Sequence, residues 1–566
     1  MRSMKGYTKM IQNFDTYFPR TLENEERIKS IRAEAVKMVG EPIEALPYSY
    51  FKIYYETGSR VEYEQLYMKH RRRLWHFLAM AMWEDDSTWI NEVCDSISAI
   101  CGEPLWAFPA HVKADASYLE MHDRIDLFAA ETAHALAETT YLLSERLPRT
   151  IKELVHYNID QRIVKPYLRE YYDYGPANWS AVCHGCVAMS FIELGLSDAF
   201  EQGKEFIVKG LNRFLESFAD DGICQEGPLY WSYGFGHFTY AASMIREYTN
   251  GEIDMFKVDK MKNIASFYEH TFVAPTFTVP FADAGHLLYL NPGLISFLSK
   301  EFGTAPICKR AAMKYGSDTR WRFGDMVRNF FWGGELMEEY TPRYGTQFFD
   351  NAQWYVKRAA KYVIAAKGGH NNEPHNHNDV GSLVVYAGGQ YVVDDLGWPE
   401  YDATYFNKQY RYTKYLCASS LGHSVPIVNG NAQIYGDKYK AEVIEHSDNQ
   451  YKLDLSQAYG LDTGSIIRSI ISDENGIVIS DTSYGDNTHI SRIALRIKPE
   501  VNENSIMVGS AVISCDTPCS ISLSSEEFET RYSVAESDTE RYVTAYLVDF
   551  KPLSGVKETR LRIEFV

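Results

Sequence analysis

Apolar side chains recur at helical spacing from residue 20 to about residue 335. One such face contains Leu211, Phe214, Leu215 and Phe218, which follow the i, i+3, i+4, i+7 pattern of an amphipathic helix. Many such faces joined by short connections are typical of a helical bundle, a solenoid or a closed ring of helix pairs. No strict repeat period is present in the sequence, so the pattern alone leaves these three arrangements open.

From about Tyr344 onward the pattern changes from helical to alternating. Tyr451, Leu453 and Leu455 lie at every second position, as on a strand with one buried face. The runs SIIRSII and GIVIS meet across residues 473–476, where Asn-Gly is a strong hairpin signal. Helices and then strands in separate blocks predict an α+β chain of two domains, a helical one over 1–340 and an antiparallel β domain over 341–566.

The most distinctive polar stretch lies in the β block, over residues 368–397. It reads GGHNNEPHNHNDVGSLVVYAGGQYVVDDLG, and its two apolar runs, joined by a Gly-Gly pair, predict a β-hairpin that delivers Asp394 and Asp395. Because residues two apart on an extended strand face the same side, His375 and His377 are expected to project together.

Two imidazoles and one carboxylate from this region could form a zinc site. The candidate ligands are His377, His423 and either Asp394 or Asp395. The loop also contains four asparagines, which indicate a polar site on a rigid scaffold. A solvated, histidine-rich loop without a metal is the alternative interpretation.

The helical block has polar candidates of its own. Asn178 precedes His184, and the stretch FADDGICQEGPLYWSYGFGH places Glu226, Tyr230 and Tyr233 just beyond the end of a predicted helix. Ring packing with a hydrogen-bonded hydroxyl is the alternative for the two tyrosines.

Composition excludes several classes of protein. The net charge of −19 argues against nucleic-acid binding, although a local basic cleft could still bind a polyanion. Nine scattered cysteines do not predict a disulfide framework, and the single CxxC at residues 183–186 is better explained by packing thiols. The sequence shows neither a secretory signal nor an apolar run of membrane-spanning length, so a cytoplasmic protein with no membrane partner is expected.

The segments HNHNDVGSLVVYAGGQYVVDDLG and RYTKYLCASSLGHSVPIVNG resemble the heparinase II/III-like polysaccharide lyases, which include related alginate and oligoalginate lyases. A weaker resemblance extends to DRIDLFAAETAHALAETTYLL, NWSAVCHG and DGICQEGPLYWSYG. The resemblance implies an N-terminal (α/α) toroid of helix pairs followed by an antiparallel β-sandwich. It also implies β-elimination at a uronic acid within an acidic polysaccharide or oligosaccharide substrate.

The resemblance also implies roles for individual residues. Tyr230 matches the catalytic tyrosine, with Tyr233 as the fallback, and His184 and His375 match the catalytic histidines. Further candidates for catalysis or substrate binding are Asn178, Glu226, Tyr410, Arg411 and Tyr412.

The metal ligands match as His377, Asp395 and His423, because Asp395-Leu396-Gly397 aligns with the D-x-G of the family. The resemblance implies that this ion, zinc or another divalent metal, is structural.

The substrate is less closely defined. The helical block has a single His184 without the Asn-His pair typical of the alginate-cleaving branch, which leaves open the residue that neutralises the substrate carboxylate. A glycosaminoglycan is expected first and alginate second. The alternatives are a glycoside hydrolase that uses Glu226 and Asp283, or a non-catalytic glycan-binding protein. The oligomeric state is open, with a homo-oligomer among the options.

Overall fold

The computed structural model describes residues 18–566 except 315, 317–319, 334–335, 338–342 and 532–540. The described chain divides into two compact units. The first contains residues 18–218, Tyr230–Lys262 and the described part of 289–337, and the second contains Ala219–Leu229, Asn263–Leu288 and the described residues from 343 onward. The domain boundary near residue 340 stays a prediction. Two segments before it, Ala219–Leu229 and Asn263–Leu288, belong to the second unit.

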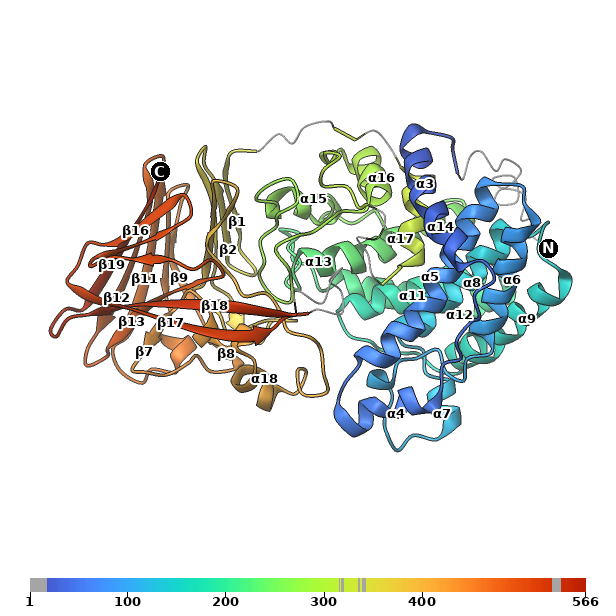
Figure 1. The fold of residues 1–566 in the computed structure, drawn as a ribbon, viewed down its shortest axis with the longest axis horizontal. Coiled ribbons are helices and arrows are strands. Elements are labelled where there is room, and N and C mark those ends of the chain that lie inside the picture. The colour runs from blue at the N-terminus through green and yellow to red at the C-terminus, as the bar shows by residue number, and fades with distance from the viewer. Residues whose placement is uncertain (1–17, 315, 317–319, 334–335, 338–342, 532–540) are drawn as a thin grey trace. The chain divides into compact units, whose positions relative to one another are not determined.

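Helices make up most of the first unit, in blue to yellow-green in Figure 1. The predicted helix face with Leu211, Phe214 and Leu215 lies buried on α12, which ends at Leu215, so Phe218 falls beyond the helix. None of the described helices combines the length and apolarity that a membrane crossing requires. The helices of this unit are α3 (Leu22–Met38), α4 (Tyr48–Thr57), α5 (Val61–Trp83), α6 (Ser87–Cys101), α7 (Tyr118–His122), α8 (Leu127–Leu142), α9 (Arg149–Ile159), α10 (Lys165–Arg169), α11 (Asn178–Glu193), α12 (Ser197–Leu215), α14 (Gly236–Tyr248), α16 (Pro292–Phe302) and α17 (Phe323–Phe331).

The second unit is built mainly of antiparallel strands, which begin at Gly345 and run to the C-terminus. They are β1 (Gly345–Phe349), β2 (Trp354–Arg358), β3 (Tyr362–Lys367), β4 (His370–Asn371), β5 (Leu383–Ala387), β6 (Gln390–Val393), β7 (Pro426–Val428), β8 (Gly436–Lys440), β9 (Glu442–His446), β10 (Gln450–Asp454), β11 (Ser465–Asp473), β12 (Gly476–Tyr484), β13 (His489–Leu495), β14 (Glu500–Val501), β15 (Ser505–Val508), β16 (Ala511–Cys515), β17 (Cys519–Glu529), β18 (Tyr542–Pro552) and β19 (Glu558–Phe565). The predicted order, helices and then antiparallel strands, is confirmed.

The strands form three main sheets and one short pair. A five-stranded sheet has the order β1-β2-β3-β5-β6, and an eight-stranded sheet has the order β14-β15-β16-β19-β12-β11-β10-β9. A four-stranded sheet has the order β17-β18-β13-β7, and β4 pairs with β8. Helix α18 (Lys408–Lys414) lies in the connection between β6 and β7, and α13 (Pro228–Tyr230) and α15 (Met261–Thr271) each contain residues of both units.

Both predicted hairpins are present. Ala387 pairs with Gln390 across Gly388 and Gly389, whose φ values of 56° and 87° suit a two-residue turn that needs positive φ at both positions. Asp473 pairs with Gly476 at the second hairpin, where the Asp473 carboxylate accepts a hydrogen bond from the backbone N–H of the turn residue Asn475 at 2.8 Å.

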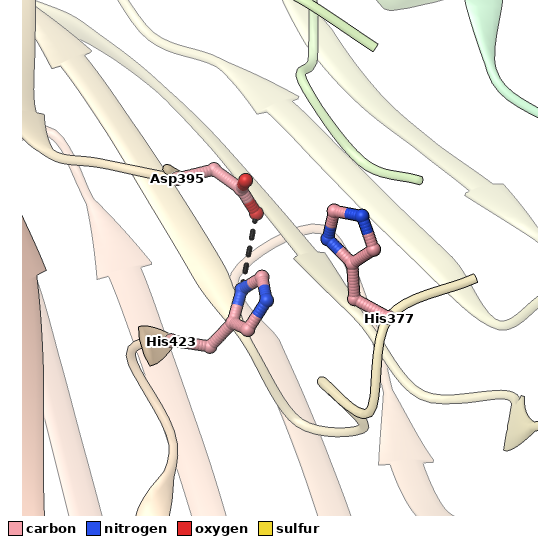
Figure 2. A group of neighbouring side chains, drawn as sticks. All are labelled: His377, Asp395 and His423. Atoms are coloured by element: carbon pink, nitrogen blue, oxygen red, sulfur yellow. Dashed lines mark ion pairs between the residues drawn. The ribbon is translucent and has the colours of Figure 1, made fainter. Parts of the chain in front are cut away.

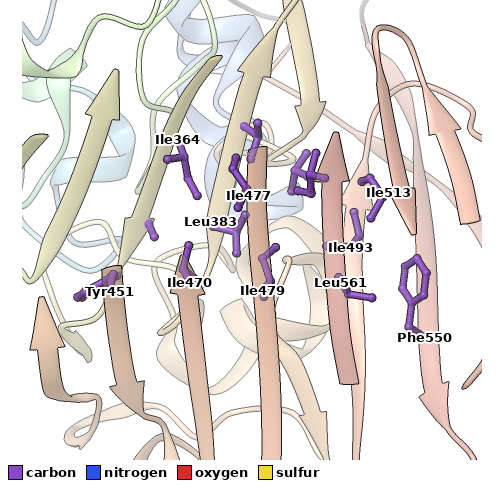
Figure 3. Packing of buried hydrophobic residues seen from close by; sticks show 14 of the residues in the cluster. Ile364, Leu383, Tyr451, Ile470, Ile477, Ile479, Ile493, Ile513, Phe550 and Leu561 are labelled. Carbon is purple, nitrogen blue, oxygen red and sulfur yellow. The ribbon is translucent and has the colours of Figure 1, made fainter. Parts of the chain in front are cut away.

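One hydrophobic core joins the main sheets of the second unit (Figure 3). Ile364 and Leu383 come from the five-stranded sheet, Ile479 from the eight-stranded sheet and Phe550 from the four-stranded sheet, and all four are fully buried. The alternating burial along β11 and β12 explains why the sequence pattern identified these strands, because every second side chain enters this core.

A buried arginine links this core to two loops that matter below. Arg468 on β11 pairs with Asp481 on β12 through two bonds of 2.7 Å. Its remaining donors reach the backbone carbonyls of Gly381 and Ser424, at 2.8 and 2.6 Å. Gly381 ends the loop that contains His375 and His377, and Ser424 follows His423.

We predict that Arg468→Ala lowers the free energy of unfolding by about 3–5 kcal/mol, because it leaves the buried Asp481 charge without its partner. Urea titration followed by tryptophan fluorescence measures this change. The control is Arg562→Ala on β19, whose pair with Asp516 is well exposed and should contribute less than about 1 kcal/mol. Equal losses in the two variants would contradict the role given to Arg468.

Candidate active site and metal centre

The polar centre of the second unit is Asp283, a fully buried carboxylate in the segment Asn263–Leu288. His375 Nδ1 donates to its Oδ2 at 2.7 Å, and His377 Nε2 donates to its Oδ1 at 3.1 Å. Three more donors complete its shell: the hydroxyl groups of Tyr401 (2.9 Å) and Tyr405 and the guanidinium of Arg411 (3.1 Å).

The charge of Asp283 is stabilised by these neighbours. Burial alone would raise its pKa, but the positive charge of Arg411 and the hydrogen bonds from His375 and His377 outweigh burial, so the pKa lies well below its usual range. The charged form of Asp283 is therefore favoured, and two of the predicted site histidines, His375 and His377, contact it.

The histidines reach Asp283 from a loop and not from a strand, so the expected strand geometry is wrong. Residues 372–382, here called the histidine loop, lie between β4 and β5. His375 has a φ of 55°, a left-handed conformation that breaks the alternation of a strand and is uncommon for a residue other than glycine. The two side chains still converge, because they bind different oxygens of one carboxylate.

Buried side chains hold the histidine loop in place. Arg411 donates to the backbone carbonyl of His375 at 3.1 Å, and Lys367 donates to Asp379 at 2.9 Å. Two loop asparagines also stabilise the loop. Asn376 donates to the carbonyl of His377 at 2.8 Å, and Asn378 donates to the carbonyl of Gln433, outside the loop, at 3.3 Å. The loop is therefore a fixed structure and not a solvated segment.

The hydrogen bond to Asp283 determines which nitrogen of His375 is available for chemistry. Because Nδ1–H donates to the carboxylate, Nε2 is the nitrogen placed to exchange a proton. Nε2 lies 4.0 Å from Glu226 Oε2, and the side chain is 19% exposed, unlike the fully buried His377. An imidazole oriented by a buried carboxylate is a common arrangement for general acid–base catalysis.

The three predicted metal ligands lie together (Figure 2). His377, Asp395 and His423 are fully buried, and one donor atom from each lies within 4.8 Å of the other two. His423 Nδ1 is 3.2 Å from Asp395 Oδ2. Asp394 turns elsewhere and pairs with His286 at 2.5 Å, so Asp395 is the carboxylate of this cluster.

The donor atoms of this cluster fit a cation. Nδ1 of both histidines and Oδ2 of Asp395 are buried without a hydrogen-bond partner. The other nitrogens are occupied, since His377 Nε2 bonds Asp283 and His423 Nε2 bonds the carbonyl of Cys417 at 2.8 Å. Such outer contacts leave a lone pair on each Nδ1, as in the carboxylate–histidine–zinc arrangement. A tetrahedral zinc with bonds of about 2.0–2.1 Å separates its donors by about 3.3 Å, close to the 3.2 Å observed here.

His184, predicted as a catalytic histidine, lies in the core of the first unit. It is fully buried, Tyr167 OH contacts its Nδ1 at 2.6 Å, and its Nε2 contacts the carbonyl of Tyr172 at 3.0 Å. Burial lowers its pKa to about 4. Both nitrogens are occupied inside the protein, which argues against the predicted proton-transfer role.

Tyr230 and Tyr233 differ sharply in environment. Tyr233 is buried and its hydroxyl donates to Glu131 at 2.5 Å, and burial together with that carboxylate raises its pKa well above the usual range. Tyr233 is therefore a poor base. Tyr230 is half-buried and ends α13, where the chain passes into a π-helical turn, Trp231–Phe235. Single π turns occur frequently at functional sites.

Asn178 lies beside that π turn. It is the first residue of α11, and Gly234 packs so closely against it that a Cβ on the glycine would lie 3.0 Å from Asn178 Cβ. This close approach explains the need for glycine in the YGFG stretch.

The three candidates of α18 have three different environments. Tyr410 is 47% exposed. Arg411 is instead buried against Asp283, and it bonds the backbone of the histidine loop. Tyr412 donates to Asn376 Oδ1 at 3.1 Å, and its ring stacks on Tyr435. Tyr401 and Tyr405 were not identified from the sequence, and the density of tyrosines over residues 401–415 is the only signal that could have indicated them.

Comparison with known proteins agrees with this architecture. Residues 341–551 match the family model described as heparinase II/III-like, C-terminal. No curated protein matches the chain. Among solved structures, the chain is similar to heparinase III, with a TM-score of 0.65 and 13% identity over 93% of this chain and 79% of the other.

Two other lyase structures are similar. The heparan sulfate lyase of Pedobacter heparinus aligns with a TM-score of 0.57 and 14% identity, over 95% of this chain and 88% of the other. The chondroitin AC lyase of Streptomyces coelicolor A3 aligns with a TM-score of 0.54 and 8% identity, over 99% and 82%. At identities this low, structural similarity establishes a shared fold and nothing more. Residues 341–551 thus resemble a heparinase II/III-like C-terminal domain, and the chain shares the helical and β-sheet fold of heparinase III.

Proposed function

We propose that this protein is a lyase that cleaves uronic-acid-containing polysaccharides or oligosaccharides by β-elimination and leaves a 4,5-unsaturated uronate. The observation that supports the proposal most is the contact of His375 with Asp283, which orients a partly exposed imidazole side chain inside the region that matches the heparinase II/III-like model. The similar structures act, by their names, on heparan sulfate and chondroitin, which favours a glycosaminoglycan over alginate.

The reaction requires three kinds of group. The C5 proton of a uronate is weakly acidic, because its removal places charge on a carboxylate that is already negative. Hydrogen-bond donors must therefore neutralise that carboxylate as charge develops, while a base takes the proton and an acid protonates the leaving O4.

We assign these roles to this chain's residues as follows. Tyr230, which is half-buried and begins the π turn, is the proton-transfer tyrosine, and His375 exchanges a proton through Nε2. Asn178 is a better neutraliser of the substrate carboxylate than His184, because both nitrogens of His184 are occupied. Asp283 is a positioning residue: it fixes the tautomer and the direction of His375.

The hydrolase alternative has less support from the geometry. It requires two carboxylates that can give and take protons, and Glu226 and Asp283 were the candidates. Asp283 accepts hydrogen bonds from five side chains and is completely buried, so it has no position for a substrate or a water.

We further propose that His377, Asp395 and His423 bind a divalent cation, with zinc as the first choice. The ion would supply a fixed positive charge between the histidine loop and the segment that contains His423. Because His377 and His375 share Asp283, ion binding would also fix the orientation of His375.

The first test is ultraviolet absorbance during incubation with hyaluronan, chondroitin, heparan sulfate and alginate oligomers. The absorbance should rise with one substrate, because the unsaturated uronate is conjugated. Tyr230→Phe and His375→Ala should each lower the rate at least about 100-fold, since each removes a proton-transfer group.

Matched controls are Tyr157→Phe and His446→Ala, which change exposed residues of the same types and should leave the rate unchanged. New reducing ends without an absorbance rise would overturn the elimination mechanism in favour of hydrolysis. Oligosaccharide binding with no product of either kind would identify a binding protein.

The positioning role of Asp283 gives a separate prediction. Asp283→Asn should lower kcat by about 10–100-fold and change KM less, because the substrate contacts remain while His375 loses its orienting anion. Steady-state kinetics measure both constants. Asp402→Asn removes a carboxylate that accepts from Lys414 at 2.9 Å near the surface, and should leave kcat unchanged. An unchanged kcat in Asp283→Asn would exclude the positioning role.

Metal removal tests the structural ion. An ion present at about 1,000 times its Kd stabilises the folded state by about 4 kcal/mol, so a chelated protein should melt at a lower temperature and lose activity in parallel. Differential scanning calorimetry of the wild type and of His423→Ala, each with and without chelator, measures the effect. Lost activity at an unchanged melting temperature would mean that the ion takes part in the reaction instead.

A further inference from the structure

The helical unit contains a second buried group of histidine and carboxylate side chains. His134 and Glu138 lie one turn apart on α8, and Glu193 is the last residue of α11. Their side chains are 1%, 3% and 1% exposed. One donor atom from each lies within 4.8 Å of the other two. No role was predicted for these residues from the sequence.

The group lacks hydrogen bonds that a buried polar site needs. His134 Nε2 lies 3.2 Å from Glu138 Oε2 and 3.5 Å from Glu193 Oε1. Nevertheless, His134 Nε2 and both carboxylate oxygens of Glu193 are buried without a hydrogen-bond partner. Buried polar atoms are almost always paired, so unpaired atoms on two side chains this close together indicate a missing partner.

The charges lead to the same conclusion. Arg328 on α17 donates to both oxygens of Glu138, at 2.5 and 2.6 Å, and so compensates one carboxylate. Glu193 lies near the arginine but has no bonded cation of its own, and burial raises its pKa to about 7. Two carboxylates and one guanidinium leave the group with one negative charge, which a bound cation or a proton on His134 or Glu193 would offset.

We propose that His134, Glu138 and Glu193 bind a divalent metal ion, with Zn²⁺ as the first choice. A tetrahedral zinc separates its donor atoms by about 3.3 Å, and the separations of 3.2 and 3.5 Å match that value. A histidine and a glutamate at i and i+4 share one face of a helix, so α8 supplies two ligands without distortion. Nitrogen and carboxylate donors together suit zinc better than calcium or magnesium.

The arrangement parallels the cluster of His377, Asp395 and His423. In both groups a buried histidine nitrogen lies 3.2 Å from a carboxylate oxygen without a hydrogen bond between them. In both, a ligand also has an outer partner, which is Arg328 for Glu138 and Asp283 for His377. The second ion joins the middle of α8 to the end of α11, the helix that begins at Asn178.

The alternative is an ion-free group with a protonated His134. Burial works to lower the pKa of His134, but Glu193 and Glu138 raise it well above its usual range. An imidazolium at His134 and the guanidinium of Arg328 would together neutralise the two glutamates without a metal. The two possibilities differ in metal content, which can be measured directly.

The experiment is elemental analysis of the full chain, purified without chelators, dialysed against Zn²⁺ and then against metal-free buffer. The wild type is compared with Glu193→Gln, His423→Ala and the double variant. Glu193→Gln should lose one metal equivalent per chain, and the double variant should hold one fewer than His423→Ala. The result does not depend on whether the His423 cluster binds an ion, because each comparison changes only Glu193.

Glu92→Gln is the matched control, since it alters a buried carboxylate of the same unit that is already paired with Arg73. It should keep the wild-type metal content. If Glu193→Gln does not fold, as judged by circular dichroism, His134→Gln provides the same comparison. Wild-type metal content in a folded Glu193→Gln or His134→Gln variant would overturn the proposal and assign the group to a protonated His134.

Discussion

The site in the β unit depends on one buried anion. Asp283 accepts hydrogen bonds from two histidines, two tyrosines and an arginine, and a carboxylate without water can stay charged only when such donors surround it. The same bonds fix the tautomers of His375 and His377, since each ring donates one N–H to the carboxylate. Asp283 therefore determines which ring nitrogen points away from it, Nε2 in His375 and Nδ1 in His377.

The surrounding structure limits how these residues can move. Arg411 bonds both Asp283 and the backbone of the histidine loop, and Arg468 bonds the end of that loop and the carbonyl next to His423. Both arginines are buried, and Arg468 reaches the loops from the eight-stranded sheet, which contributes to the hydrophobic core. The strained φ of His375 is held in place by these contacts and places its side chain on Asp283. A rigid scaffold of this kind reduces the reorganisation needed during catalysis.

In the helical unit, residues that look equivalent in the sequence have different environments. His184 fills a space against Gly210, where a Cβ would collide with its ring, and bonds through both nitrogens, so it behaves as a core residue. Tyr233 is committed to Glu131, whereas Tyr230 lies half-buried at the start of a π turn. His134 and Glu193, for which no role was predicted from the sequence, are buried and have side-chain atoms without a hydrogen-bond partner.

The sequence by itself determined the order of helices and strands, the two hairpins and the grouping of His377, Asp395 and His423, three side chains that could hold a metal ion. These features follow from local periodicity, from glycine at the β5–β6 turn and Asn-Gly at the β11–β12 turn, and from a motif confined to about fifty residues, from His375 to His423. The tertiary structure alone decided the role of Asp283, because its partner His375 lies 92 residues away and no local pattern encodes that contact. It also decided that His184 is a core residue and that the histidine loop is not a strand. Burial and hydrogen-bond saturation are properties of the packed chain, and a residue's identity does not reveal them.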